Sequence, residues 1–335
     1  MDPIDDALPS IVTLLTSNYL DLDAPDASLY PQGTLLFNTR RSGYNVKEFA
    51  LNYFNATDFP DQALPQETST WVTVSGNMTT GAPYMGRKAQ RNMVVKALKS
   101  SIATNYQIRE EDTFFNLIAT PNYCELQPDM VVLNNDRSNT AYIIGDTPLR
   151  LAANAQSITD WATNVAGATS TGETGLVTRN EYMGIYYPSG ITTDLTGTEV
   201  VIPPSHMLLR TIIYNDTVAY PWFAPAGQRR GVVDNATNIG YLDGDTGEFV
   251  TDKNRVELRN VEYTNFINPI GYFTNVGLLN YGNKNSKDTA SALDRTNVAR
   301  LICYIRERLQ QAVRPFIFEP NDSITRAEVK GVVAT

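Results

Sequence analysis

Ala141-Tyr142-Ile143-Ile144-Gly145-Asp146 is the stretch of sequence that most directly decides the fold. A second, nearly continuous apolar run extends from Phe114 to Thr120 and is closed by Pro121. Apolar runs without alternation are typical of strands that are covered on both faces, as in a sheet between two layers of helices. Helical patterns flank both runs. The sequence therefore predicts an α/β fold with a central mixed sheet flanked by helices.

Three segments have the spacing of a helix with one buried face. They run from Arg87 to Ile102, from Ser157 to about Gly167 and from about Ala292 to Val313. The second segment begins with Ser157 and Asp160 in positions that resemble a capping box. A further helix is predicted to begin at Asn321-Asp322-Ser323.

The helix from about Ala292 to Val313 has the clearest pattern. Asp294 can cap its start, and Pro315 ends it. Charged residues, Arg300 and Arg306 to Arg308, lie largely off its apolar face. We expect that apolar face to pack on the rest of the protein, and its residues are Val298, Leu301, Ile302, Ile305, Leu309 and Val313.

Further strands are predicted at residues 33–39, 71–76 and 181–188. The segment Asp243-Gly244-Asp245-Thr246-Gly247 lies between two short apolar runs and predicts a hairpin, because Asp-Gly accepts the positive φ of such turns. Its alternating acidic residues also suit a calcium loop. However, the remaining ligands, including a glutamate at the twelfth position, are missing.

Composition limits the classes of partner. The chain has 335 residues, enough for more than one compact unit, and its formal net charge of −9 repels nucleic acid and anionic membranes. The apolar stretch at residues 11–15 is too short for a membrane span. Cys124 and Cys303 both lie in apolar surroundings, which favours two buried, reduced thiols.

Signals for catalysis or cofactor binding are weak. One His and two distant Cys cannot supply a zinc site, and neither a GxGxxG nor a GxxxxGK[ST] loop is present. His206, at the start of an apolar stretch, could serve as a base for a nucleophile, but a helix cap or a buried imidazole is favoured. We therefore predict no catalytic, cofactor-binding or metal-binding residues, and no cofactor.

Three ordered stretches resemble contractile-tail sheath proteins of tailed bacteriophages. The first is the strand at 182–188 followed by Val200-Val201-Ile202-Pro203-Pro204-Ser205-His206-Met207, which is similar to a sheath strand and its Pro-Pro-Ser entry to a helix. The second is Tyr220-Pro221-Trp222-Phe223-Ala224-Pro225-Ala226-Gly227-Gln228-Arg229-Arg230-Gly231. The third is Leu293-Asp294-Arg295-Thr296-Asn297-Val298-Ala299-Arg300-Leu301, with Thr296 and Ala299 replacing two family residues. Residues 30–45 resemble the sheath proteins of large phages.

The resemblance implies a division of the chain. Residues 1–65 would be a lead-in remnant of an upstream domain, 66–291 the sheath core domain, and 292–335 the start of a small α+β C-terminal domain. Family members continue beyond this point to a C-terminal strand, so the resemblance implies a fragment. In the family, terminal arms add strands to the sheets of neighbouring subunits.

The resemblance also implies a function. The chain would be a structural subunit, not an enzyme, of a contractile sheath that polymerises helically around a tail tube and contracts to drive the tube through the host envelope. Implied partners are other copies of the chain and the tail tube and baseplate proteins, without direct nucleic-acid contact or membrane insertion. The implied location is the virion, after assembly in the host bacterial cytoplasm. Two alternatives are the sheath of a bacterial contractile injection system and, less favoured, a hydrolase of α/β fold.

Basic side chains are the candidate contacts between subunits, because an acidic chain can supply carboxylates on the neighbour. Two neighbouring arginines follow the aromatic segment at 220–223, and four belong to the predicted C-terminal helix. The candidates are Arg229, Arg230, Arg295, Arg300, Arg306 and Arg308.

Overall fold

The computed structural model describes residues 95, 98–110, 112–169, 172–243 and 248–334. After helical residues at 98–104, the first part of the chain forms η2 (Gln107–Arg109), β1 (Leu117–Ala119), η3 (Cys124–Leu126), α4 (Gln127–Asp136), β2 (Tyr142–Asp146), α5 (Ala155–Ala162), β3 (Met183–Tyr187), β4 (Ser189–Thr193), β5 (Glu199–Ile202) and α6 (Pro204–Val218). The second part forms α7 (Gly227–Arg230), β6 (Asn238–Leu242), β7 (Phe249–Thr251), α8 (Val256–Thr264), β8 (Ile267–Phe273), β9 (Gly277–Asn280), α9 (Thr296–Val313), η4 (Arg314–Phe316) and α10 (Ser323–Ala334).

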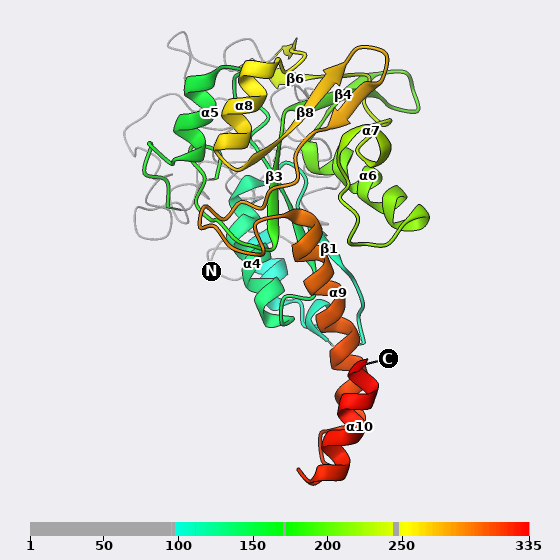
Figure 1. The fold of residues 1–335 in the computed structure, drawn as a ribbon. Helices are drawn as coiled ribbons and strands as arrows, with labels where there is room; N and C mark the ends of the chain where they lie inside the picture. The colour runs from blue at the N-terminus through cyan, green and yellow to red at the C-terminus, as the bar shows by residue number, and fades with distance from the viewer. Residues whose placement is uncertain (1–94, 96–97, 111, 170–171, 244–247, 335) are drawn as a thin grey trace, which may run out of the picture.

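A five-stranded mixed sheet forms the centre of the molecule (Figure 1). Its order is β1-β2-β3-β8-β9. The first four strands are parallel, and β9 is antiparallel to β8. Every residue of β2 and β3 is buried, as the continuous apolar run at 141–146 predicts. The predicted α/β fold with a central mixed sheet is confirmed.

Two hydrophobic cores cover the two faces of this sheet. Ile143 and Ile185 point to one face, where they pack with residues of α4, α5 and α8. Tyr142 and Tyr186 point to the other face, where they pack with residues of α6 and α9. Because successive residues of a strand face opposite sides, one short run supplies both cores. Full burial of each large apolar side chain stabilises the fold by about 1.5–3 kcal/mol.

A second, four-stranded antiparallel sheet has the order β5-β4-β6-β7. β4 and β6 lie at the upper end of the molecule in Figure 1. The predicted hairpin around Asp243 is confirmed by the pairing of β6 with β7 and by a 2.8 Å bond from the Asp243 amide to the Glu248 carbonyl oxygen. Residues 244–247 lie outside the described part.

Two of the predicted helix starts are wrong. Asn154, not Ser157, caps α5, because the Asn154 side chain accepts a hydrogen bond from the Ser157 amide. Asp294 does not cap α9, whose first residue is Thr296 and whose N-cap residue, Arg295, makes no capping side-chain bond. The start of α10 is as predicted, since the Asp322 carboxylate accepts bonds from the amides of Ile324 and Thr325.

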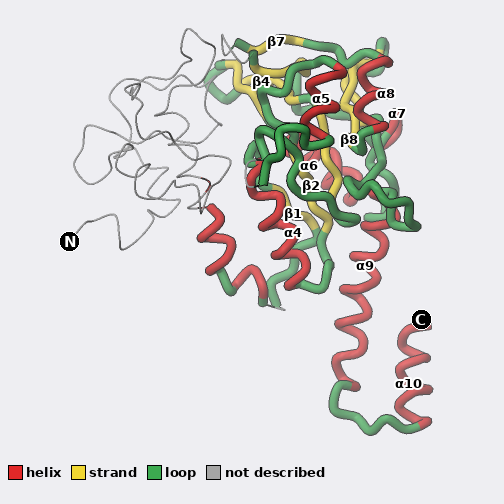
Figure 2. Tube along the Cα trace, turned by 90° about the vertical axis from the view of Figure 1, so that its left-hand side faces the viewer, coloured by secondary structure: helices red, strands yellow, loops and turns green. Residues whose placement is uncertain are grey.

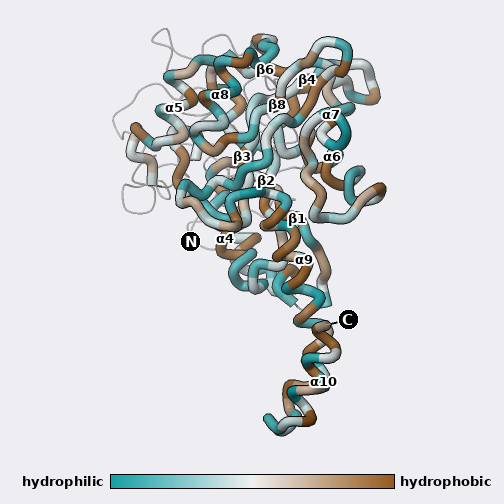
Figure 3. Tube along the Cα trace, viewed as in Figure 1, coloured by the Kyte–Doolittle hydropathy of each residue, from teal (hydrophilic) through white to brown (hydrophobic). Residues whose placement is uncertain are grey.

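The buried face of α9 also differs from the prediction. Thr296, Ala299, Arg300 and Cys303 are buried; of the predicted face, Ile302 packs against the core, whereas Ile305 is 38% exposed. Ile305 lies two residues from Cys303, which is about 200° around a helix of 3.6 residues per turn. The helix therefore turns a polar, small-residue face to the sheet, and hydrophobic residues remain along its outer side and on α10 (Figure 3).

The end of α9 and all of α10 extend away from the sheet, as the two perpendicular views show (Figures 1 and 2). No residue of α10 is buried. Three earlier predictions, the strands at 33–39 and 71–76 and the lead-in at 1–65, lie outside the described residues, as does most of the helix from Arg87. The proposed domain boundaries stay predictions.

Candidate functional site

The first half of α9 is joined to the central sheet by buried polar groups. The Tyr142 hydroxyl on β2 donates a 2.9 Å hydrogen bond to the Asn285 side-chain oxygen and lies 3.0 Å from the Thr296 hydroxyl. The Cys303 thiol donates to the carbonyl oxygen of Ala141. Buried hydrogen bonds of this kind define one position for the helix, because each unpaired group would cost free energy.

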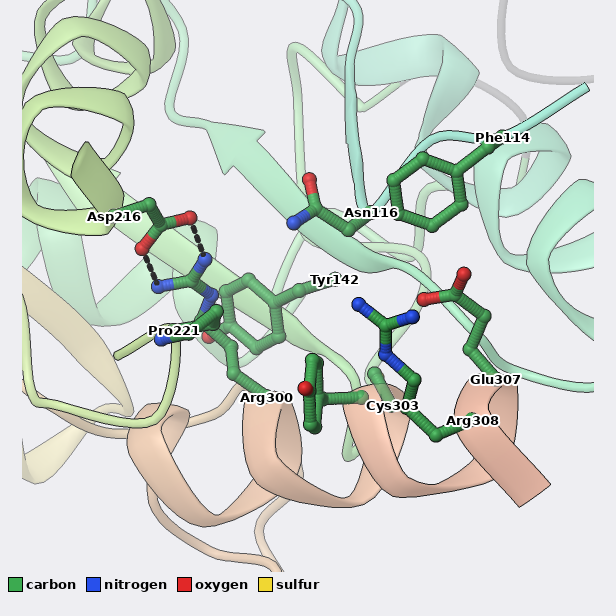
Figure 4. A pocket seen from close by; sticks show the side chains of 10 residues that line it. Phe114, Asn116, Tyr142, Asp216, Pro221, Arg300, Cys303, Glu307 and Arg308 are labelled. Carbon is green, nitrogen blue, oxygen red and sulfur yellow. Dashed lines mark hydrogen bonds and ion pairs between the residues drawn. The ribbon is translucent and has the colours of Figure 1, made fainter. Parts of the chain in front are cut away.

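An ion pair joins α9 to the C-terminal end of α6. Arg300 is 3% exposed and makes two bonds to the Asp216 carboxylate, the longer at 3.0 Å (Figure 4). A planar guanidinium suits such two-point contact. The charge of Arg300 is thus met inside the chain and not by a neighbour.

Beside this ion pair, six side chains stack in series across the surface. Arg230 lies over the ring of Phe223, with 4.4 Å to the ring centroid, and Arg308 lies over Tyr304 at 5.2 Å. The rings between them are in sequence Phe223, Tyr220, Trp222 and Tyr304, with centroid separations of 6.2, 4.7 and 5.3 Å. We call these six residues the aromatic–arginine ladder. It connects the segment at 220–230 to α9.

A hollow of about 270 Å³ lies against the ladder. Tyr304 and Arg308 belong to both, and Phe114 and Pro221 add apolar surface on the other sides (Figure 4). Arg300, Tyr304 and Arg308 follow one another at intervals of four residues, so they share one face of α9. That face therefore presents the ion pair, the hollow and one end of the ladder together.

The six predicted contact arginines fall into different environments. Arg230 and Arg308 end the ladder, and Arg229 is exposed beside Arg230 on α7. Arg295 is paired with Asp294 and donates to the Tyr263 hydroxyl. Arg306 lies over the ring of Tyr182, 4.9 Å from its centroid. Arg300 is the buried member.

A second group of buried polar residues, around Asp146, lies at the N-terminus of α6. The Asp146 carboxylate accepts bonds from the Ser205 amide at 2.6 Å, the Ser205 hydroxyl at 2.7 Å and the Asn122 amide at 2.8 Å. Burial raises the pKa of Asp146 to about 6, and these donors limit the rise. The prediction for His206 is wrong: it is exposed in the first turn of α6 and is neither cap nor buried, because Asp146 provides the cap.

Sequence reasoning names the aromatic segment at 220–223, Arg230 and Arg308 as separate features. It misses Tyr304, which joins the two parts of the ladder, and it misses their arrangement. The available signal was the four-residue spacing of Arg300, Tyr304 and Arg308, which places an aromatic residue between two arginines on one helix face.

Two other kinds of site were considered for the protein, a metal centre and a membrane-spanning helix. Within the part of the chain that the structure describes, no three His, Cys, Asp or Glu residues gather as ligands of a metal ion would. None of the helices in those ranges combines the length and apolar character that crossing a membrane requires. Cys124 and Cys303 are both buried thiols, as predicted.

Comparison with known sequences gave two phage proteins. The tail sheath protein of Vibrio phage KVP40 is 32% identical over 120 residues, which cover 36% of this chain and 16% of that protein. The tail sheath protein of Enterobacteria phage T4 is 27% identical over 115 residues, or 34% of this chain and 16% of that protein. The match thus spans about a sixth of the length of each curated relative. No protein-family model matches the chain.

Comparison with solved structures gave contractile assemblies. The sheath complex of PVC, an extracellular contractile injection system, in its contracted state has a TM-score of 0.51 and 19% identity, covering 72% of this chain and 57% of that one. A chain of the contracted baseplate of the anti-feeding prophage has a TM-score of 0.50 and 20% identity, covering 70% and 58%. The resemblance to tail sheath proteins in sequence, and the sheath-like fold, are therefore confirmed.

Proposed function

We propose that the chain is a structural subunit of the contractile sheath around a phage tail tube, which polymerises helically and contracts to drive the tube through the host envelope. The observation that carries the proposal is the sequence similarity to two phage tail sheath proteins. The shared fold with the sheath of a contractile injection system supports it.

The geometry suits a subunit that moves as a rigid body. The buried bonds of Thr296 and Arg300 fix α9 on the sheet, so a force on the outer end of α9 is transmitted to the body. Contraction by rotation of rigid subunits needs free energy stored in their interfaces, and it needs neither a catalytic group nor a cofactor. Under this proposal the chain is not an enzyme.

The partners follow from the proposed function. They are other copies of the chain in a helical sheath, together with tail tube and baseplate proteins. The location would be the virion, after assembly in the host bacterial cytoplasm. A net charge of −9 favours protein partners over nucleic acid.

We retain five arginines as proposed contacts between subunits. Arg229, Arg230 and Arg308 gather at the ladder, and Arg295 and Arg306 lie elsewhere on or beside α9. Each exposed ion pair contributes about 0–1 kcal/mol. A tube of identical subunits multiplies that contribution.

The sheath of a bacterial contractile injection system is a second candidate. The solved structures favour it, because both chains quoted above come from such systems or from a related prophage particle. The subunit would work in the same way in either particle. Nothing in the described residues favours the hydrolase alternative.

Assembly of the purified chain tests the proposal. We expect light scattering, sedimentation velocity and negative-stain microscopy to show association that grows with concentration and ends in rings or tubes. The double variant Arg306→Glu/Arg308→Glu should weaken it. As a matched control, Lys253→Glu/Arg255→Glu makes the same charge change at exposed positions before α8. Because the resemblance implies a fragment, the same assays are run on a version extended through the natural C-terminus. If both versions remain monomeric at every concentration, the proposed function is refuted.

A further inference from the structure

The two arginines of the ladder form no ion pair with a carboxylate of the described residues, although the charge of Arg308 acts on the neighbouring Glu307. Arg229 beside them makes no ion pair with another described residue either. Stacking on Phe223 and Tyr304 restricts the side chains, so less conformational entropy is lost when an acidic group binds. Tyr220 is 62% exposed and adds apolar surface. The ladder thus suits a partner that is both acidic and apolar.

The tip of the β4–β5 hairpin has that composition. Leu195 at the tip is fully exposed at 108%. Asp194 and Glu199 flank it and are exposed, and no Lys or Arg occurs between Arg179 and Arg210. A fully exposed leucine is costly to leave in water. The two carboxylates beside it have the opposite charge to the arginines of the ladder.

Hydrogen bonds within the turn restrain the hairpin tip. The Asp194 carboxylate accepts bonds from the Thr196 amide at 2.8 Å, the Thr198 amide at 2.9 Å and the Thr196 hydroxyl at 2.7 Å. These bonds lower the pKa of Asp194, so the tip stays negatively charged well into the acidic range. A tip held in one conformation loses little entropy on docking.

We propose that the β4–β5 hairpin tip of one copy docks on the aromatic–arginine ladder of a second copy. Leu195 enters the hollow between Phe114, Pro221 and Tyr304, and the acidic groups of the hairpin face Arg230 and Arg308. We assign the occupant to another copy because Leu195 is fully exposed among the residues that the structure describes, and because the acidic tip and the basic ladder are complementary in charge. This inference rests on the proposed function and names one contact of the assembly.

The contact joins two different surfaces of the same chain. β4 lies at the upper end of the molecule in Figure 1, and the ladder runs from α7, also in the upper half, to α9, which runs toward the lower end. A head-to-tail contact between unlike surfaces builds rings or open helices and does not stop at a dimer. That symmetry is the one that a helical sheath requires.

Cross-linking tests the contact directly. Thr193→Cys places a thiol near the tip, and Gln228→Cys places one beside Arg229; both positions are exposed, and neither side chain belongs to the ladder or to the Asp194 turn. One variant carries an affinity tag, the two are mixed, and a short bis-maleimide is added. We expect a heterodimer whose linked peptides contain positions 193 and 228.

A matched control replaces Thr193→Cys by Thr251→Cys, an exposed position on β7, which is an edge strand of the same sheet. A yield no higher than this control, at a concentration where the wild-type chain is associated, would overturn the contact and leave the proposed function standing. If neither the wild-type chain nor the version extended through the natural C-terminus ever associates, the proposed function and the contact with it are overturned.

Charge reversal provides a second measurement. Arg230→Glu/Arg308→Glu should weaken self-association about tenfold, because two attractive pairs become repulsive. Adding Glu199→Arg to the same chain should recover part of the loss. Unchanged association of the double variant, or no recovery with Glu199→Arg, would count against the contact.

Discussion

The two ends of α9 are held in different ways. Residues 296–303 contain every buried side chain of the helix, and three of them, Thr296, Arg300 and Cys303, bond to other parts of the fold. Residues 309–334, which we call the arm, contain no buried side chain and expose Phe318 at 98%. The comparison teaches that the two stretches have different tasks. Buried polar bonds fix residues 296–303 on the body of the protein, whereas the exposed apolar residues of the arm remain available for contact with another protein surface.

The largest expected effect on stability comes from removing the ion pair between Arg300 and Asp216. Arg300→Met should lower the free energy of unfolding by up to about 3–5 kcal/mol, because the partly buried Asp216 carboxylate is left without its partner. Urea unfolding followed by circular dichroism measures the loss. The double variant Arg300→Met/Asp216→Leu should regain most of it, and an equal loss in both variants would show that the two residues do not act as a pair.

A pH series tests the buried carboxylate that starts α6. The pKa of Asp146 is about 6 in the folded chain and about 3.9 when unfolded, so the folded state binds the proton more tightly. This group's contribution to stability is therefore full below about pH 4 and is lost as the pH rises through 6, a change of about 3 kcal/mol.

The measurement is the difference between wild type and Asp146→Asn, which removes the titrating group. Subtraction is needed because burial also raises the pKa of Glu262, with the same sign. A difference between the two unfolding free energies that stays constant from pH 4 to pH 7 would contradict the shifted pKa.

A smaller effect is expected at the hydroxyl that meets α9. Tyr142→Phe keeps the ring in the core and removes its bonds to Asn285 and Thr296, which should cost about 1–2 kcal/mol. Thermal unfolding measures the change. Tyr187→Phe serves as the matched control, because it loses one bond to the Leu151 carbonyl oxygen on the other face of the sheet. Hydrogen exchange of the α9 amides should be as in wild type for Tyr187→Phe and faster for Tyr142→Phe.

The smallest effect is expected in the arm. Phe318→Ser changes a side chain that makes almost no contact, so the free energy of unfolding should change by no more than about 0.5 kcal/mol. Denaturant midpoints of wild type and variant are compared. A loss as large as that of Tyr142→Phe would show that the arm packs on the body and would remove the contrast between the two stretches.

Sequence patterns were sufficient for the sheet and insufficient for α9. The run at 141–146 is apolar throughout because both faces of β2 are covered, and that property is visible locally. The buried face of α9 contains Thr296 and Arg300, and a pattern that treats polar residues as exposed selects the wrong side. The groups that make their burial possible, Tyr142 and Asp216, lie 154 and 84 residues away in the chain.

The candidate site shows the same division. Arg230 and Arg308 could be named from charge alone, but their association through Tyr304 depends on contact between the segment at 220–223 and α9. The cap of α6 by Asp146 is equally non-local, since Ser205 lies 59 residues further on. Contacts across such separations are set by the fold as a whole and leave no local signature in the sequence.

The cap of α6 bears on the order in which parts of the chain fold. Bonds between Asp146 and Asn122 close a loop of 24 residues, those to Ser205 a loop of 59, and the contact of Tyr142 with Thr296 one of 154. Shorter loops close at a lower entropic cost. The contact between Tyr142 and Thr296 closes the longest of these loops, and Thr296 leaves the ribosome after the other residues in these contacts. We therefore expect the nascent chain to fold in that order, with α9 docking after the sheet has formed; pulse-labelled hydrogen exchange that protects α9 before β2 would contradict it.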